Sequence, residues 1–463
     1  MTSIDSTLIS ADLSHKAQNP HGNDKVCALR SKGRCSAAKA IGILLIGGCT
    51  GIAWAQTLVP PTTVTLPASS VAAPTDAGVL AHTYLQILAS SKNFTAAPQV
   101  TGPPFAGLLY QTPASIACVY NLQPAIPGCN PNSASLNPTG GGNAIAIVDA
   151  FDDPNAFADL QFFSKQFGLA PISSSSFQVV FAPSGGFPPG SCGGGAALRP
   201  PSALNTGWDI EESLDIEWSH AMAPRATLYL VEAQSSSLLD LFCAVTVASN
   251  LVNAAGGGEV SMSWGSGEFP DETLGDPVFT TPKVVYFAST GDAPGVSYPS
   301  ASPNVVSVGG TSLSFDPATG KFIGENTWQD TGGGASLFEP RPSYQNANIA
   351  HIVGLQRGTP DVASDANPAT GVWVWDSLGA PPGGFWYIVG GTSVSSPTWA
   401  GIVNAAGGFA ASSLAELVQL YSAPTADFTG IKVGNCGPYM SIFASGSWDF
   451  CSGRGSPRGY KGK

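Results

Sequence analysis

Residues 385–406 read FWYIVGGTSVSSPTWAGIVNAA, in which an apolar run, a pair of glycines and a proline-containing segment follow one another. The run Phe385–Val389 is apolar throughout, which is typical of a strand buried on both faces. The glycines that follow it let the backbone turn tightly. Pro397 suits the first turn of a helix, which we predict over Ser396–Ala406, because the amide hydrogen that proline lacks would be unpaired there anyway.

The same alternation of strand and helix recurs upstream. Ala144–Val148 is another continuous apolar run, and Ala156–Phe167 has helical spacing. Similar patterns predict strands at Thr227–Val231, Glu259–Trp264, Val284–Ser289 and Val305–Val308 and a helix over Leu238–Val252. Strands that alternate with helices predict an α/β fold, namely a doubly wound, mostly parallel sheet with helices on both faces.

The composition fits an acidic protein with a sizeable core. Of the 463 residues, 43% are apolar and only 11% are charged. The 19 basic against 31 acidic residues argue against a nucleic-acid binder, which would need a basic face. A chain with few basic residues also gains little repulsive positive charge when its carboxylates protonate, which suits work in acid. An ordinary acidic extracellular protein would have a similar composition.

The start of the chain has the features of an export signal. Basic residues precede an apolar run, Ile41 to Ala53, that glycines interrupt and that is too short for a stable membrane span. Ala53-Trp54-Ala55 has the small-x-small pattern of a cleavage site, so we predict cleavage near Ala55 and a secreted or periplasmic protein. Lipid attachment at Cys49 is the alternative.

The sequence divides into three segments. We predict a signal peptide over residues 1–55, a linker or short prosegment over 56–105 that includes one short helix from Gly78 to Ser91, and the main domain over 106–463. We expect the protein to be a monomer.

Six of the nine cysteines lie beyond the export segment. An even number in an exported chain predicts disulfides. Closeness along the chain favours Cys118–Cys129 and Cys436–Cys451, which leaves Cys192–Cys243. A metal site is the weaker alternative, because no pair has C-x-x-C spacing.

Ser393 stands at the strand-to-helix junction of the first stretch. The amides that begin the predicted helix can stabilise an oxyanion beside its hydroxyl; a Ser- and Thr-rich helix cap is the structural alternative. The pattern G-T-S-x-S-x-P resembles the serine motif shared by subtilisins and sedolisins. A subtilisin also needs a histidine followed by Gly-Thr, and none of the five histidines has that neighbour. We therefore expect carboxylates rather than a histidine to activate Ser393.

Residues 211–224 provide such carboxylates. The spacing of apolar residues predicts a helix that ends at Pro224. Glu211 and Asp215 are four residues apart, so both emerge from one helix face, where acidic residues usually just face water. A close pair can share a proton and pass it between serine and leaving group. The sedolisin family carries E-x-x-x-D on a helix, and this resemblance implies that Glu211 is the base and that Asp215 orients it.

The resemblance implies three further site residues. Asp292, in a Gly-Asp turn after the strand Val284–Ser289, corresponds to the family aspartate of the oxyanion hole, which must be protonated to donate a hydrogen bond. Asp149, at the end of the first buried strand, would extend the carboxylate relay. Trp264 corresponds to a tryptophan beside the acidic residues. A plain turn, a strand-end cap and a core aromatic are the respective alternatives.

Sedolisins also bind calcium near the C-terminus through two aspartates and three carbonyls, a set that suits a hard cation. The resemblance places Asp449 as one aspartate and the carbonyls at Ile431, Ser445 and Ser447. Gly430 stands where the other aspartate is expected. We therefore expect calcium to bind weakly or not at all, with a Cys436–Cys451 disulfide holding the loop instead.

The sequence thus indicates an exported, acid-acting serine-carboxyl peptidase with a subtilisin-like fold that cleaves protein or peptide substrates. A catalytically silent, sedolisin-like binding protein is the alternative. A lipase or esterase is less favoured, because the G-x-S-x-G elbow and a later histidine are both missing around Ser393.

Overall fold

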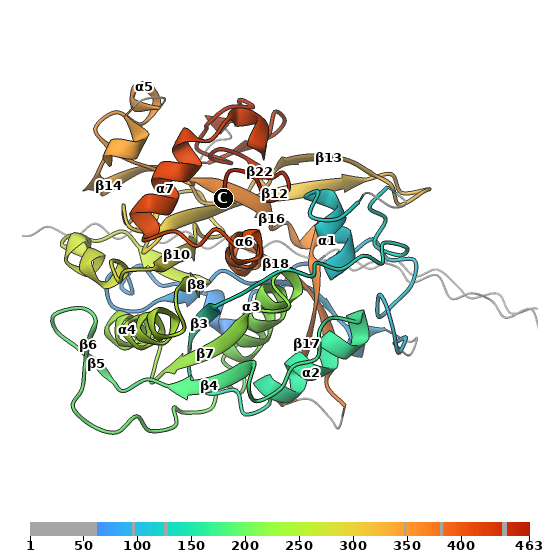
Figure 1. Ribbon diagram of the computed structural model, residues 1–463, viewed down its shortest axis with the longest axis horizontal. Coiled ribbons are helices and arrows are strands. Elements are labelled where there is room, and N and C mark those ends of the chain that lie inside the picture. Colours follow the sequence, from blue (N-terminus) through green and yellow to red (C-terminus); the bar gives the residue numbers. More distant parts are fainter. Residues whose placement is uncertain (1–62, 95–97, 125–127, 347–348, 380–382, 438–441) are drawn as a thin grey trace, which may run out of the picture. The chain divides into compact units, whose positions relative to one another are not determined.

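The computed structural model describes residues 63–94, 98–124, 128–346, 349–379, 383–437 and 442–463 (Figure 1). The predicted signal peptide over residues 1–55, with Cys49 and the cleavage site near Ala55, lies outside the described residues. Among the residues that are described, no helix combines the length and the apolar character needed to cross a membrane.

A mostly parallel sheet of eight strands forms the centre of the domain. Its strands are β3 (Ala144–Ala150), β4 (Phe177–Phe181), β7 (Thr227–Ala233), β8 (Gly258–Met262), β10 (Val284–Ser289), β12 (Val306–Phe315), β13 (Phe322–Thr327) and β16 (Val362–Asp365). The order is β13-β12-β10-β8-β3-β7-β4, and β16 pairs with β12 beside this path. All pairs are parallel except β12 with β13. The predicted fold class is therefore confirmed.

Helices cover both faces of this sheet. The main ones are α2 (Ala156–Phe167), α3 (Trp208–Met222), α4 (Leu238–Ala254), α6 (Thr392–Ala406) and α7 (Ser413–Ser422). Successive side chains of a strand point to opposite faces, so Ala146 and Val148 of β3 pack with α4, whereas Ile145 and Ile147 pack with α3 and α6. Figure 1 accordingly shows α4 on one side of the central strands and α3 and α6 on the other.

Smaller elements surround this core. They are α1 (Pro113–Val119), α5 (Ala350–Val353), β1 (His82–Thr83), β2 (Gln86–Ser90), β5 (Gly185–Gly186), β6 (Ser191–Cys192), β9 (Trp264–Gly267), β11 (Ser297–Tyr298), β14 (Gly334–Pro340), β15 (Gln356–Thr359), β17 (Val372–Asp376), β18 (Phe385–Gly390), β19 (Phe428–Thr429), β20 (Asn435–Cys436), β21 (Ile442–Phe443) and β22 (Ser456–Pro457). The strands β17, β18 and β2 form one small sheet, and β1, β9 and β11 form another.

The strand-to-helix junction predicted from residues 385–406 is present, with one difference. Helix α6 begins at Thr392, four residues before the predicted start, so Ser393 lies in the first turn of the helix rather than in a loop before it. Gly391 precedes the helix with φ 105°, a backbone conformation that favours glycine.

The predicted helix over Gly78–Ser91 is wrong. The segment is extended there: β1 pairs antiparallel with β9, and β2 pairs antiparallel with β18. Its apolar spacing resembles a helix, but two strand edges far away in the sequence offer main-chain partners, and such tertiary pairing overrides local propensity. Residues 81–90, within the segment predicted over 56–105, are therefore packed into the domain, whereas most of residues 63–80 are exposed.

The three predicted disulfides are present. They join Cys118 to Cys129, Cys192 to Cys243 and Cys436 to Cys451. The second of these ties β6 to α4 across 51 residues of sequence.

Candidate active site

Ser393 is fully buried at the start of α6, where the backbone leaves β18. Its hydroxyl donates a hydrogen bond to the carbonyl oxygen of Ser263 at 3.1 Å and accepts one from the amide of Tyr84 at 3.1 Å. The amide of Ser393 donates to the carbonyl oxygen of Tyr84 at 3.3 Å. The predicted nucleophile is therefore in contact with the main chain of residue 84, on the segment predicted to be a linker.

Glu211 and Asp215 reach this place because α3 packs directly on α6. Gly401 permits the close approach, since a Cβ atom there would lie 2.6 Å from the Cβ of Met222. Ser263 then links the two helices: its hydroxyl lies 2.8 Å from Oδ1 of Asp215 and 3.2 Å from the carbonyl oxygen of Ser393. Sequence reasoning missed Ser263, although it directly precedes the Trp264 that was singled out.

The carboxyl groups of Glu211, Asp215 and Asp149 are all fully buried. Burial raises the pKa of Glu211 and of Asp215 well above the usual range, and the nearby charge of Asp149 adds to both shifts. Burial raises the pKa of Asp149 to about 8. No ion pair with a basic side chain reaches these three groups within the described chain. They therefore retain protons between them rather than all carrying charge.

Two hydroxyl groups lie near the carboxyl group of Glu211 without forming a hydrogen bond to it. Neither of its oxygens makes a hydrogen bond to a described residue. The hydroxyls of Ser393 and Thr83 lie close enough to oppose the upward shift of its pKa. In this arrangement the hydroxyl of Ser393 is turned to Ser263, and a rotation about its Cβ–Oγ bond would redirect the hydroxyl hydrogen to Glu211.

Asp292 lies beside the same carbonyl oxygen of Tyr84. Its Oδ1 accepts hydrogen bonds from the amide and the hydroxyl of Thr392, at 2.7 and 3.0 Å. Its Oδ2 is buried and has no partner among the described residues, although the side chain as a whole is partly exposed. A Cβ on Gly391 would lie 1.8 Å from the carbonyl oxygen of Tyr84 and 2.6 Å from Oδ2 of Asp292. These two oxygens therefore lie close to each other.

Burial raises the pKa of Asp292 to about 8, against the opposing bonds from Thr392. The group is therefore protonated in acid. Because Oδ1 already accepts two hydrogen bonds, the proton belongs on Oδ2, from which it can be donated to a neighbouring oxygen.

Trp264 supports this arrangement through the backbone. It is fully buried, and its ring nitrogen donates to the carbonyl oxygen of Val148 at 2.7 Å. It thereby fixes the end of β3, where Asp149 follows, rather than bonding to a carboxylate. The predicted site residues Asp149 and Trp264 thus lie at the same edge of the sheet as Ser393.

A segment of the chain itself passes through the site in extended form. On the N-terminal side of Tyr84, His82 pairs with Gly265 and Thr83 pairs with Trp264. On its C-terminal side, Gln86 pairs with Gly390. The side chain of Tyr84 lies against Gly265 and Gly291, where added Cβ atoms would be 2.5 and 3.4 Å from its atoms. Its main chain is therefore held on both sides of the serine, as antiparallel strand addition holds a bound peptide.

Two histidines of the described chain have partners elsewhere. The ring of His82 contacts Asp76 at 2.9 Å and the carbonyl oxygen of Ser69 at 3.2 Å. The ring of His220 contacts the carbonyl oxygen of Ala170 at 2.9 Å. Neither of them bonds to Ser393.

Two of the groups expected to hold calcium, the carboxylate of Asp449 and the carbonyl of Ile431, accept hydrogen bonds instead. Oδ1 of Asp449 accepts from the amides of Cys451 and Ser452 and from the Ser452 hydroxyl, and Oδ2 accepts from the amide and hydroxyl of Ser445. The carbonyl oxygen of Ile431 accepts from the Gly446 amide at 2.7 Å. These oxygens are thus turned to N–H and O–H donors instead of a common centre.

Gly430 leaves no room for the aspartate that the resemblance leads us to expect at this position. A Cβ at this position would lie 2.4 Å from the carbonyl oxygen of Gly446. The loop around Asp449 is therefore closed by hydrogen bonds and by the Cys436–Cys451 disulfide.

A second group of acids could hold a metal ion. Carboxylate oxygens of Asp153, Asp159 and Asp376 lie within 4.8 Å of one another, and all three residues are buried. Burial, followed by repulsion from other acids, raises the pKa of Asp376 to about 9. Protons shared between the groups would relieve the same repulsion as a cation would.

Comparison with known proteins points to one family. No family model matches the chain. It is 29% identical over 357 residues to kumamolisin from Bacillus sp. (strain MN-32), covering 70% of this chain and 59% of that protein. It is 25% identical over 361 residues to sedolisin from Pseudomonas sp. (strain 101), covering 70% and 57%. The chain thus spans somewhat less than three fifths of the length of these relatives.

A solved structure has the same fold. The Pseudomonas sedolisin, a serine-carboxyl proteinase complexed with two molecules of pseudo-iodotyrostatin, superposes with a TM-score of 0.58 at 24% identity. The match covers 76% of this chain and 96% of that one.

Proposed function

We propose, from the premise that the chain belongs to the sedolisin family, that it is a serine-type peptidase acting on peptide bonds in acid. The observation that carries this proposal is the contact between Ser393 and the main chain of Tyr84. A peptide carbonyl oxygen lies at the amide of the serine and beside Asp292, which is where an oxyanion hole would bind the carbonyl under attack.

In the proposed reaction, Oγ of Ser393 bonds to the carbonyl carbon while its proton passes to Glu211. Asp215, held by Ser263, orients Glu211 and shares the proton with it. The C–N bond then breaks as the proton moves to the leaving amine. Water hydrolyses the acyl ester by the same proton transfers in reverse, which restores the serine hydroxyl.

Asp292 would stabilise the negative oxygen that forms in each step. Its pKa of about 8 keeps it protonated in acid, so it can donate a hydrogen bond together with the amide of Ser393. Asp149 would extend the carboxylate set, and Trp264 would position it through the backbone of β3.

The test is hydrolysis of a denatured protein from strongly acid to slightly alkaline pH by the wild type and by Ser393→Ala. Ser396→Ala is the matched control, because this serine of the same helix is equally buried but bonds to Ser261. We expect activity in acid that declines toward slightly alkaline pH, is lost in Ser393→Ala and is kept in Ser396→Ala. Equal turnover by the wild type and Ser393→Ala would refute the nucleophile.

A catalytically silent binding protein is the second candidate. One observation favours it, namely that the groove at Ser393 is filled by the chain's own residues. The four proposed catalytic groups favour the peptidase instead. A folded wild type that leaves both the denatured protein and its own residues 82–90 uncut would make the silent protein the better proposal.

The other properties follow from this function. We propose that residues 56–105 contain a short prosegment ahead of the catalytic domain, that the protein is exported after cleavage near Ala55, and that it works as a monomer on protein or peptide substrates. The three disulfides support an oxidising compartment. Calcium at Asp449 has no part in the proposed mechanism.

A further inference from the structure

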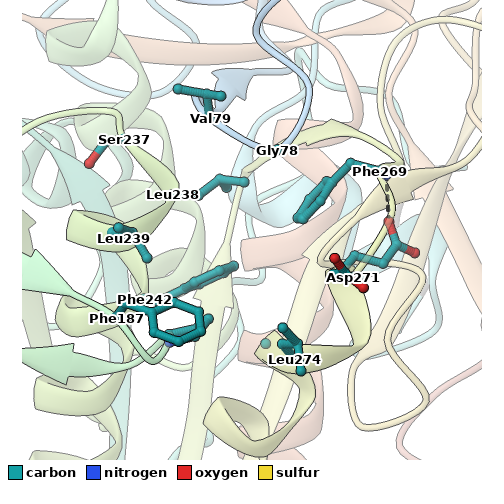
Figure 2. A pocket seen from close by; sticks show the side chains of 13 residues that line it. Gly78, Val79, Phe187, Ser237, Leu238, Leu239, Phe242, Phe269, Asp271 and Leu274 are labelled. Atoms are coloured by element: carbon teal, nitrogen blue, oxygen red, sulfur yellow. Dashed lines mark hydrogen bonds between the residues drawn. The ribbon is translucent and has the colours of Figure 1, made fainter.

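An apolar pocket of about 470 Å³ lies beside the path of the bound segment. It lies between the start of α4 and residues 269–275, and Figure 2 shows the rings of Phe242 and Phe269 at two of its sides. Four large apolar side chains at the pocket are exposed by 38–75%: Val79, Phe187, Leu239 and Leu274. Exposed apolar side chains gathered in this way mark a binding surface more often than scattered ones do.

The bound segment leads directly to this pocket. Counted back from Tyr84, His82 is the third residue, Ala81 the fourth and Val79 the sixth. The amide of Ala81 donates to the carbonyl oxygen of Ser236 at 2.8 Å, and the amide of Leu238 donates to that of Val79 at 2.9 Å. The main chain is therefore held well beyond the third residue before Tyr84, and the held part ends at the pocket.

The segment itself leaves the pocket unfilled. Gly78, the seventh residue, leaves no room for a side chain, because a Cβ there would lie 2.8 Å from the ring of Phe269. Val79 is 59% exposed at the rim. Ala81 is buried against the neighbouring core but adds only a methyl group. A larger apolar side chain in this stretch would bury area that the chain's own residues do not.

We propose that the pocket is a substrate subsite for an apolar side chain four to six residues before the cleaved bond. This rests on the proposed function, with Tyr84 marking the residue before the cleaved bond. An enzyme that releases tripeptides ends its substrate at the third residue, whereas this groove holds main chain up to the sixth. The occupant is an extended polypeptide with a hydrophobic residue upstream of the cut.

The test compares three fluorogenic peptides, with the full-length protein as enzyme after acid incubation. The first copies residues 79–89 with Val79→Phe, FLAHTYLQILA, so that a larger apolar side chain can enter the pocket. The second has serine in place of its first three residues. The third begins at the histidine and so offers three residues before the bond. We expect kcat/KM for the first peptide to exceed that for the other two about tenfold or more, as filling an apolar pocket typically gives.

A pair of variants tests the pocket itself. Leu274→Asp places a charge at its rim, and Leu355→Asp places one at an equally apolar, 80% exposed position outside it. We expect Leu274→Asp to abolish the advantage of the first peptide over the second and Leu355→Asp to keep it. A change of oligomeric state in Leu274→Asp with the advantage intact would make the pocket a subunit interface and overturn the subsite.

The outcomes separate this inference from the proposed function. Hydrolysis of denatured protein with equal rates on all three peptides, or with tripeptides as the main products, would overturn the subsite and leave the peptidase standing. Failure to hydrolyse any substrate would overturn both.

Discussion

The amide of Ser393 donates to the carbonyl oxygen of Tyr84 at 3.3 Å, while the amide of Tyr84 donates to the hydroxyl of Ser393 at 3.1 Å. The two residues are 309 positions apart in the sequence. Ser393 thus exchanges hydrogen bonds with both the amide and the carbonyl group of Tyr84 and, with Asp292 beside it, is placed to attack that carbonyl group. In the proposed enzyme, the first substrate would therefore be the chain itself.

We predict that the protein cuts its own Tyr84–Leu85 bond in acid. The bond follows the carbonyl group that Ser393 and Asp292 contact, and β1 and β2 hold the chain on both sides of it. Intact mass and N-terminal analysis after acid incubation should reveal a product that begins at Leu85.

The Ser393→Ala variant should stay intact under the same conditions, and Ser396→Ala should be cut like the wild type. Cleavage whose rate rises with protein concentration would show that one molecule cuts another. A first cut at a different bond would mean that Tyr84 does not mark the scissile position.

We predict that Asp292 sets the alkaline limit of activity. Its pKa of about 8 means that it loses its proton as the pH rises through that value. The resulting carboxylate would repel the oxyanion, so the rate should fall. In Asp292→Asn the amide donates at every pH, and the decline near pH 8 should disappear. Asp292→Ala should lower kcat about 100- to 1000-fold, as for the loss of one oxyanion donor. If the rate of Asp292→Asn still fell near pH 8 as in the wild type, Asp292 would not set the alkaline limit.

The parts of the site that sequence predicted are those with a local signal. Ser393 sits in a strand–turn–helix pattern, and Glu211 and Asp215 share a helix face by their spacing. Two of the disulfides followed from closeness along the chain, and the third from the two cysteines that remained. The sheet followed from continuous apolar runs, which report burial on both faces.

The parts that sequence missed depend on long-range pairing. Residues 78–91 have apolar spacing that suits a helix, yet they become strands because β9 and β18 offer free edges. Tyr84 acquires its place only through this pairing. Ser263 is a small polar residue after a strand, and nothing local distinguishes it from Ser261, which bonds to Ser396 instead.

We predict that the loop around Asp449 is stabilised by hydrogen bonds and not by calcium. Asp449→Ala removes the acceptor for donors from Ser445, Cys451 and Ser452 and should lower the free energy of unfolding by about 1–3 kcal/mol. A chelator should shift the melting temperatures of the wild type and of Asp449→Ala equally. A larger shift of the wild-type melting temperature would show that calcium binds in this loop. A shift that Asp376→Asn abolishes would place an ion at the acidic cluster.

We predict that the protein becomes less stable as the pH rises from about 4 to 8. Burial raises the pKa of several carboxyl groups to about 8 or 9: Asp149, Glu232, Glu272 and Asp292. In the unfolded chain these groups release their protons near pH 4, so between these values the native state binds more protons. Each such group lowers the free energy of unfolding by up to about 1.4 kcal/mol per pH unit.

The variant Glu259→Gln tests the predicted pH dependence of stability at a position away from the active site. Burial raises the pKa of Glu259 well above its usual value, and an amide can replace its hydrogen bond with Asn404. The variant should therefore show a shallower fall of melting temperature with pH. Asp316→Asn is the control, because hydrogen bonds from Thr319 lower the pKa of this exposed group. A melting temperature that rises toward neutral pH would mean that the buried acids are ionised and paired in the native state, and the protonated oxyanion acid would then lose its physical basis.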